Sequence, residues 1–296
     1  MKAQRWIGFG CLLLTACWLL VFPMNGQAQV LWSVEGPEGQ QNWLLGTVHS
    51  EDPRLLDFPP EVLEALERSQ RLALELVPDM AMLETLNQTM HFSEPRLHQI
   101  IEPDLYQALV DILEKHYGMG EPAARMLRPW AAAMTISLPP PQTGLFMDLA
   151  LAVRARSLGL EVLALERLEE QLDFLAGMSK PLQLELLEQA VSDFPRQDEL
   201  LEELMQTYLS GDLERLESVA AEQTSELDPA LRDHFEQVGM VQRNHTMAER
   251  AGPLLEQGGL MIAVGALHLP GEEGLIALLR EAGFRLEPVT TMLPDP

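Results

Sequence analysis

The sequence predicts an α/β protein with a mixed central β-sheet, flanked by helices and carrying a helical insertion in its middle. Strand-like segments alternate with helical ones towards both ends of the chain, whereas the residues between them are rich in Leu and Glu at helical spacing. The chain has 296 residues, 47% of them hydrophobic, which is enough for one sizeable core. We therefore expect a single domain over 29–296, with helical insertions at roughly 80–145 and 168–256.

The first half of the expected sheet begins with a hairpin. Segments 30–36 and 42–49 look like strands, and "PEGQQ" between them carries the Pro and Gly of a turn. A helix is expected at 58–70, with Pro60 in its first turn. The apolar segment 71–77 is expected to form the next strand, which Pro78 ends.

The second half follows the same pattern. A helix is expected at 147–159, where Gly159 ends it, and a strand at 160–166. The apolar segment 259–269 predicts a buried strand, followed by a helix at 274–283. The segment "FRLEPVT" is expected to close the sheet as its last strand.

The charge of the chain excludes several classes of function. With 45 acidic against 20 basic residues, the formal net charge is −25. A nucleic-acid partner is not expected, since basic side chains must neutralise phosphates, and docking on anionic lipid is disfavoured. The sequence also has no P-loop, no Gly-x-Gly-x-x-Gly after a strand and no Gly-x-Ser-x-Gly.

The N-terminal residues are typical of a secretory signal. Lys2 and Arg5 precede a nearly wholly apolar stretch at 7–22, and small residues follow up to Ala28. We interpret 1–28 as a signal peptide and expect a periplasmic or envelope-associated protein. The alternatives are an uncleaved anchor and a lipoprotein with Cys17 as lipid acceptor, and in either case this segment alone would attach the protein to a membrane.

The cysteines restrict the chemistry. Cys11 and Cys17 are the only two in the chain, and both lie in the predicted signal peptide. Thiol catalysis, Cys-based zinc sites and disulfides are therefore not expected in the exported protein. Any metal must be held by His, Asp, Glu or Asn side chains.

Two stretches share one layout, "LLGTVH" at 44–49 and "AVGALH" at 263–268. Each places a Gly and then a His, His49 or His268, behind a predicted strand. Ligands gather beyond the carboxyl ends of strands in α/β sheets, and neutral imidazole is a common metal ligand. The alternative is that each His is merely a hydrogen-bonded residue at the end of a strand.

Two carboxylates end apolar strands in the same way. Glu75 lies in "LALELVP" and Glu166 ends "EVLALE". A buried carboxylate must be paired, hydrogen-bonded or bound to metal, although strand alternation would place either one on a solvated face. With the two histidines, Glu75 completes a set of His49, Glu75 and His268 that suits zinc, manganese or cobalt.

The helical segment "VQRNHTMAER" at 241–250 offers polar donors. Arg243 and Asn244 are candidates for stabilising an oxyanion or a polarised carbonyl. Arg243 would otherwise pair with a surface Glu, as expected in so acidic a chain. Asp148 is interpreted either as a helix-start residue or as a polar member of the site.

Taken in order, these segments resemble the TraB/GumN family over roughly 30–290. The likeness is carried by "LWSVEGPEGQQNWLLGTVHSEDPRLLDFPPEVLEALERSQRLALELVPD", "RPWAAAMTISL", "GLFMDLALAVRARSLGLEVLALERLEEQLDF", "QRNHTMAER" and "MIAVGALHLPGEEGLIALLREAGFRLEPV". The family is related to the Tiki proteases, which are metal-dependent membrane-associated peptidases. It belongs to a wider group with erythromycin-esterase-like and haem-binding ChaN-like proteins.

The resemblance implies an α/β core with a mixed sheet and a site at the two Gly-x-x-His motifs. It implies site roles for the residues at matching positions, namely His49, Glu75, Glu166, Arg243, Asn244 and His268. The chain departs from its relatives at "SEDPRLLDFPP", which is acidic where they often have small or basic residues. Because of this difference, the substrate preference of the relatives does not carry over to this chain, whereas the site residues do.

The leading hypothesis is an exported metal-dependent hydrolase, and specifically a peptidase, acting on a peptide or small-molecule substrate. His49, Glu75 and His268 would hold a divalent ion of Mn, Co or Zn, and Glu166 would act as general base. The alternative is a non-catalytic binder of a peptide signal, haem or another small ligand on the same scaffold. A third possibility is an envelope protein whose Leu/Glu-rich helices bind partner proteins.

Overall fold

A computed structural model describes residues 28–77 and 80–293. The predicted signal peptide and both cysteines lie outside these residues, apart from Ala28. Within the described residues, no helix is both long enough and apolar enough to cross a membrane.

The centre of the protein is a mixed six-stranded sheet, as expected from the sequence, with the order β4-β3-β5-β2-β1-β6. Four neighbouring strands, from β4 to β2, are parallel, whereas β1 is antiparallel to both β2 and β6. The predicted hairpin is the β1–β2 pair. The strands are β1 Ala28–Glu35, β2 Gln41–Thr47, β3 Arg71–Leu74, β4 Glu161–Ala164, β5 Leu260–Gly265 and β6 Arg285–Thr291.

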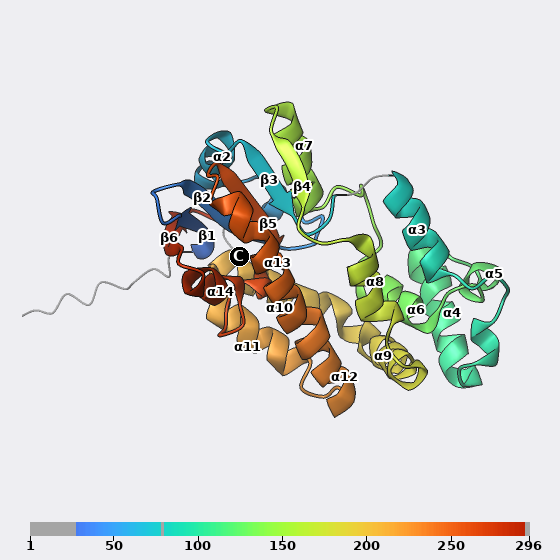
Figure 1. Cartoon of the computed structure of the whole chain (residues 1–296). Helices are drawn as coiled ribbons and strands as arrows, with labels where there is room; N and C mark the ends of the chain where they lie inside the picture. Colours follow the sequence, from blue (N-terminus) through green and yellow to red (C-terminus); the bar gives the residue numbers. More distant parts are fainter. Residues whose placement is uncertain (1–27, 78–79, 294–296) are drawn as a thin grey trace, which may run out of the picture.

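The helices form two groups, a division that Figure 1 shows for all of them except α12, whose ribbon there runs on into α13. One group packs around the sheet, and the other, here called the helical lobe, lies to the side. Those around the sheet are α1 Pro53–Leu56, α2 Pro60–Glu67, α7 Met147–Ser157, α10 Gln197–Ser210, α11 Leu213–Gln223, α13 Gln242–Leu255 and α14 Leu275–Glu281. The helical lobe consists of α3 Met80–Met90, α4 Pro103–Tyr117, α5 Glu121–Ala124, α6 Pro129–Ser137, α8 Leu168–Ala176, α9 Lys180–Asp193 and α12 Pro229–His234.

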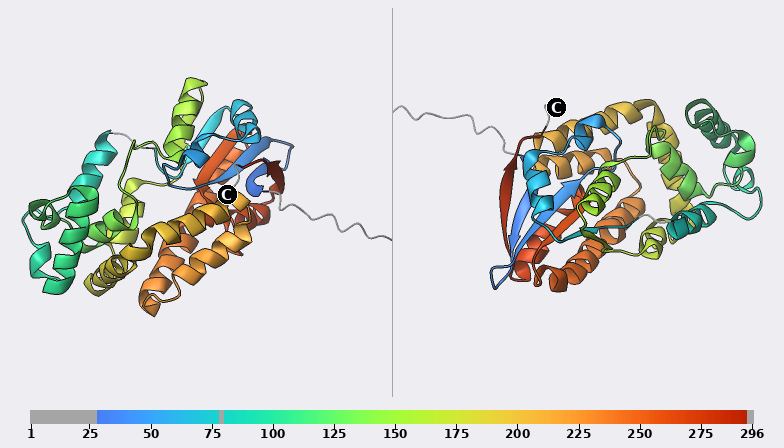
Figure 2. Two further views of the ribbon diagram at one scale, coloured as in Figure 1. Left: turned by 180° about the vertical axis from the view of Figure 1, so that it is seen from behind. Right: turned by 90° about the horizontal axis from the view of Figure 1, so that it is seen from above.

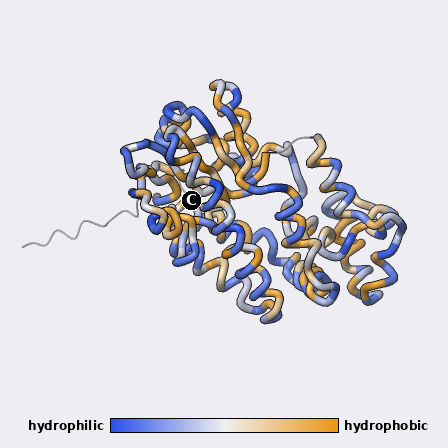
Figure 3. Tube along the Cα trace, in the orientation of Figure 1, coloured by the Kyte–Doolittle hydropathy of each residue, from blue (hydrophilic) through white to orange (hydrophobic). Residues whose placement is uncertain are grey.

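Each group has its own hydrophobic core. The sheet core joins the strands to apolar residues of α7, α10, α11, α13 and α14, and the core of the helical lobe is built mainly from α4, α6, α8 and α9. The two further views in Figure 2 show the same separation between the sheet and the helical lobe. In Figure 3 hydrophobic and hydrophilic stretches alternate along the helices of the lobe, which is the pattern of amphipathic helices that pack on one side.

Local sequence explains where several elements begin and end. Pro60 and Pro103 occupy first turns, where a missing N–H costs nothing. Gly118 ends α4 and Gly211 ends α10, each with a positive φ that suits glycine.

The extent of one predicted strand is corrected at the carboxyl end of the sheet. The predicted strand 259–269 is shorter, because β5 ends at Gly265 and a 3₁₀ turn, Ala266–His268, follows. His268 therefore lies in a turn beyond the strand. Phe235–Val241 forms a π-helix between α12 and α13, which a 3.6-residue pattern does not predict.

Candidate functional site

Polar side chains meet where the parallel strands end. Thr47 of β2 pairs with Gly265 of β5, and Leu74 of β3 pairs with Ala263 of β5 and Ala164 of β4. The residues that follow these strands therefore lie along one edge of the sheet. Such an edge is where α/β proteins commonly bind ligands.

Glu75 immediately follows β3 and accepts three hydrogen bonds. Its Oε1 accepts from the backbone N–H of Gly265 at 2.7 Å. Its Oε2 accepts from Arg243 Nη2 at 2.7 Å and from Gln171 Nε2 at 3.2 Å. The Glu75 carboxylate is thereby fixed to β5, α13 and α8 at once.

Glu166 shares the same arginine. Its side chain is only 1% exposed, and its Oε1 accepts from Arg243 Nε at 2.9 Å. Its Oε2 accepts from Arg243 Nη2 at 2.7 Å and from Gln171 Nε2 at 2.9 Å. One guanidinium thus bridges two carboxylates, with a bidentate contact to Glu166.

The charge of Arg243 is held in place by this arrangement. Burial opposes the charged form, but hydrogen bonds and the charges of Glu166 and Glu75 together raise the pKa of Arg243 above its ordinary value. Because two negative carboxylates surround one positive guanidinium, the cluster favours an additional positive charge nearby.

His268 is buried and oriented by a neighbour on α13. Its Nδ1 lies 2.6 Å from Asn244 Oδ1, and Asn244 Nδ2 donates to the backbone carbonyl of Glu273 at 2.8 Å. An amide oxygen only accepts hydrogen bonds, so Nδ1 of His268 carries the proton in its contact with Asn244. Burial lowers the pKa of His268, although the charge of Glu75 opposes this, so the ring is neutral with a lone pair on Nε2. Nε2 lies 3.7 Å from Glu75 Oε1.

His49 has a different environment at the same edge. Its side chain is 61% exposed, and its ring lies on Phe146 with 3.8 Å between the ring centroids. Its Nδ1 is 3.7 Å from Asp148 Oδ2, and the other oxygen of Asp148 accepts from Thr47 Oγ1 at 2.6 Å. Asp148 therefore lies in the first turn of α7, as one interpretation of the sequence expects, and it also contacts His49.

The loop before α7 is anchored beside His49. The carboxylate of Glu51 accepts from the backbone N–H groups of residues 142, 143 and 144 and from the Thr143 hydroxyl, at 2.6 to 3.1 Å. This loop leads directly to Phe146, which packs on His49. Glu51 therefore helps to position the wall beside His49.

A family model, that of the TraB/PrgY/gumN family, matches residues 30–288. The chain belongs to this family. No curated protein and no solved structure shows significant similarity to the chain. Membership confirms the family resemblance seen in the sequence.

In this member of the family, two of the three predicted metal ligands come close together. Glu75 and His268 are neighbours, whereas His49 contacts Asp148 and Phe146. Throughout residues 28–77 and 80–293, no group of three or more His, Cys, Asp or Glu side chains is arranged to hold a metal ion. The donor chemistry of the pair suits an ion, since a His held at Nδ1 by another side chain is the usual orientation of a metal ligand.

The predicted catalytic residues of this family member have contacts that differ from their expected roles. Both oxygens of Glu166 accept hydrogen bonds from Arg243, and the side chain is only 1% exposed, so this carboxylate is enclosed away from solvent water. Both polar atoms of the Asn244 side chain are also bound, one to His268 and one to Glu273. Their geometry supports positioning roles, in which Glu166 fixes Arg243 and Asn244 fixes His268.

Sequence reasoning missed Gln171, which joins both carboxylates from the first turn of α8. A single Gln that follows Glu170 and precedes Leu172 in a helix carries no signal of its own. It also missed Tyr208, a buried residue of α10 whose hydroxyl donates to the carbonyl of Gly46 at 2.9 Å. Both are detectable only when the fold brings distant segments together.

Proposed function

We propose that the protein is an exported metal-dependent hydrolase, and specifically a peptidase, whose centre is the Glu75–His268 pair. One observation carries this proposal: Nε2 of His268, with its lone pair, lies 3.7 Å from a carboxylate oxygen of Glu75. Two ligands of one ion, with bonds of roughly 2.0–2.2 Å, lie about 3–3.5 Å apart. The observed separation therefore needs only a small adjustment.

The residues that would hold a divalent ion of Mn, Co or Zn are His268 and Glu75, with His49 as the third. His49 is exposed and lies at the same edge of the sheet, so its side chain has room to rotate. A bound ion would polarise a scissile carbonyl and lower the pKa of a water molecule.

The remaining residues keep the pair in position. Asn244 fixes the His268 ring, while Gly265, Gln171 and Arg243 fix the Glu75 carboxylate. Arg243 also has an Nη1 group whose contact with the carbonyl of Gly239 is long, at 3.4 Å. We assign this group to stabilising the oxyanion of a substrate.

For proton transfer we assign Asp148 in place of Glu166. Its side chain is 21% exposed, and its Oδ2 lies 3.7 Å from His49 Nδ1. A partly exposed carboxylate is able to contact water and take a proton from it, whereas Glu166 is enclosed by Arg243 and Gln171. Asp148→Asn is expected to lower kcat by about 10²–10⁴-fold.

Export and envelope localisation are part of this proposal and rest on the residues 1–28. The acidic chain supports a peptide or small-molecule substrate over a nucleic acid.

The test is hydrolysis of a peptide library by the protein lacking 1–28. The protein is stripped of metal and then supplied with Mn²⁺, Co²⁺ or Zn²⁺, and cleavage is read by mass spectrometry. We expect cleavage only with metal, and a loss of at least about 100-fold in His268→Ala and Glu75→Gln. His91→Ala, in the helical lobe, is the control and should cleave normally.

Two results would contradict the proposal. Equal cleavage by His268→Ala and the unchanged protein would remove this pair from the reaction. Metal binding without any cleavage would favour the alternative, a binder of a peptide signal, haem or another small ligand.

A further inference from the structure

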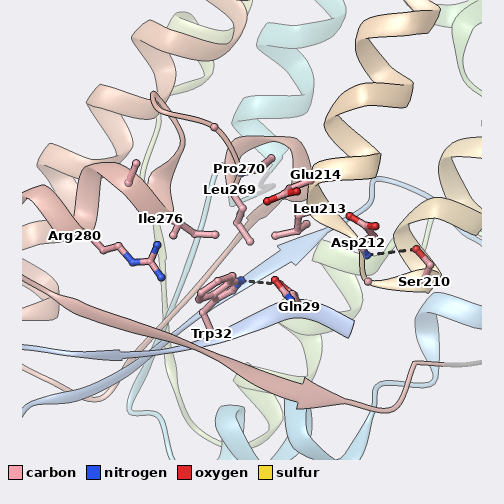
Figure 4. A pocket seen from close by; sticks show the side chains of 13 residues that line it. Gln29, Trp32, Ser210, Asp212, Leu213, Glu214, Leu269, Pro270, Ile276 and Arg280 are labelled. Carbon is pink, nitrogen blue, oxygen red and sulfur yellow. Dashed lines mark hydrogen bonds between the residues drawn. The ribbon is translucent and has the colours of Figure 1, made fainter. Parts of the chain in front are cut away.

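A cavity of about 450 Å³ lies outside the Glu75–His268 pair, between β1, the start of α11 and α14. Its size is within the range of small-molecule sites in proteins, roughly 300–1,000 Å³. Figure 4 shows Trp32 in the middle of the cavity, with Arg280 at one end and Asp212 and Glu214 at the other. The cavity therefore carries charges of opposite sign at its two ends.

The middle of the cavity is apolar. Trp32, Leu213, Leu269 and Ile276 line it, and all four side chains are largely buried. The indole N–H of Trp32 is already bound to the carbonyl of Gln29 at 2.7 Å, so the ring presents an apolar surface. A ligand whose body is apolar would find a matching wall here.

At one end of the cavity, the Arg280 side chain contacts an aromatic ring and a backbone carbonyl but no acidic side chain of the described residues. Its guanidinium lies 5.5 Å from the centroid of the Trp32 ring, and Nη2 donates to the carbonyl of Leu286 at 3.1 Å. Among residues 28–77 and 80–293, no carboxylate forms an ion pair with Arg280, although the chain has 45 acidic side chains against 20 basic ones. A fixed guanidinium with free N–H groups is suited to binding a carboxylate.

The opposite end is acidic and open. Asp212 caps α11 by accepting from the N–H of Arg215 at 2.9 Å, and its side chain is exposed. Glu214 is also exposed, and in the described part of the chain its carboxylate has neither a hydrogen bond nor an ion pair. Two carboxylates that are not neutralised attract an ammonium group.

From these contacts we propose that the cavity binds a small zwitterion with an apolar body, of the class of a free apolar amino acid or a dipeptide. Arg280 binds its carboxylate, Asp212 and Glu214 bind its ammonium group, and Trp32 with Leu213, Leu269 and Ile276 packs on its apolar body. The site is distinct from the Glu75–His268 pair, and its existence does not depend on metal binding or hydrolysis.

The experiment is calorimetric titration of the protein lacking 1–28 with L-leucyl-L-leucine, in the absence of metal. We expect saturable binding of one molecule per chain. N-acetyl-leucyl-leucine lacks the ammonium group and leucyl-leucine amide lacks the carboxylate, and each should bind at least about tenfold more weakly, because each loses a charge-assisted contact. Equal affinity of the blocked and free forms, or no saturable binding, would overturn the proposal.

Variants locate the site. Arg280→Gln and Glu214→Gln should each weaken L-leucyl-L-leucine binding by about tenfold, whereas Arg280→Lys, which keeps the charge, should bind better than Arg280→Gln. Glu281→Gln and Arg285→Gln are matched controls, because both residues are exposed near the cavity without lining it. Wild-type affinity in both Arg280→Gln and Glu214→Gln would overturn the proposed site.

Discussion

The two Gly-x-x-His motifs have the same spacing and very different surroundings. His268 is 5% exposed, with Nδ1 bound to Asn244 and Nε2 beside Glu75. His49 is exposed, packs on Phe146 and has the carboxylate of Asp148 at 3.7 Å. One histidine is fixed by buried hydrogen bonds, whereas the other lies at the rim.

This difference shows that a shared motif determines where in the fold a side chain lies, but not how firmly its neighbours hold it. Both histidines follow neighbouring parallel strands, since Thr47 pairs with Gly265. His268 is held by Asn244 of α13, which is itself bound to the backbone carbonyl of Glu273. Neither residue lies near the first motif in the sequence, so that motif has no equivalent support. We therefore expect the buried contacts around His268 to contribute most to the stability of the protein. The exposed surroundings of His49 are expected to adapt when a ligand binds.

The largest expected effect tests the buried network on the His268 side. Arg243→Met leaves Glu75 and Glu166 without their shared cation, and should lower the free energy of unfolding by about 3–5 kcal/mol. Chemical denaturation measures this. Arg54→Met is the control, because Arg54 pairs with Asp52 and Glu202 at the surface and should cost about 1 kcal/mol or less. Equal losses in the two variants would contradict the account.

The next prediction concerns the close approach of the two motifs. A Cβ at Gly46 would lie 3.0 Å from both Cα and Cβ of Ala266, so Gly46→Ala should destabilise the protein by about 1–3 kcal/mol. Gly252→Ala is the matched control, since a Cβ there meets nothing within 4 Å and α13 should become slightly more stable. Thermal unfolding compares them, and a stabilised Gly46→Ala variant would show that the motifs do not pack as described.

A smaller, pH-dependent effect is expected between α8 and α13, where Glu170 forms an ion pair with Arg250. Hydrogen bonds from Arg250 hold the pKa of Glu170 well below its ordinary value, against the opposing effect of burial. Glu170→Gln should therefore lower the free energy of unfolding at pH 7 by about 1–2 kcal/mol. Because the folded-state pKa is lowered, this contribution is present above the unfolded value of 4.5 and is lost as pH falls below it.

Denaturation curves of the unchanged protein and Glu170→Gln, from neutral to acidic pH, provide the measurement. The difference between the two should shrink as the solution becomes more acidic. A difference that stays constant or grows towards low pH would rule out the ion pair between Glu170 and Arg250 as its cause.

The smallest effect is expected on the His49 side. Glu51→Gln removes the charge that accepts from the loop 142–144, so amide hydrogen exchange should accelerate several-fold in this loop while the sheet stays protected. Glu38→Gln, in the exposed β1–β2 turn, is the control and should leave the loop unchanged. Unchanged exchange in Glu51→Gln would show that the anchor does not order the wall beside His49.

Much of the fold is readable from the sequence because its signals are local. The apolar run at Leu260–Gly265, the turn of the β1–β2 hairpin and Pro60 each predict an element where one occurs. The sequence places the end of β5 too late, since Ala266 and Leu267 continue an apolar run that periodicity alone does not divide.

The candidate site is readable only in part. Residues such as Glu75 and His268 stand out because a polar side chain follows an apolar strand. Their hydrogen-bond partners do not stand out, because they lie far away in the sequence. Arg243 is 77 positions from Glu166, and Gln171 is 96 positions from Glu75. The roles of Glu166 and Asn244 depend on such contacts, and no local pattern of residues specifies them.

The most direct test of the central claim is calorimetric titration of the metal-free protein with Zn²⁺, compared between His268→Ala, His49→Ala and the control His91→Ala. We predict one ion per chain, an affinity at least about 100-fold weaker in His268→Ala, a smaller loss in His49→Ala and no change in His91→Ala. Undiminished Zn²⁺ affinity in His268→Ala would contradict the central claim.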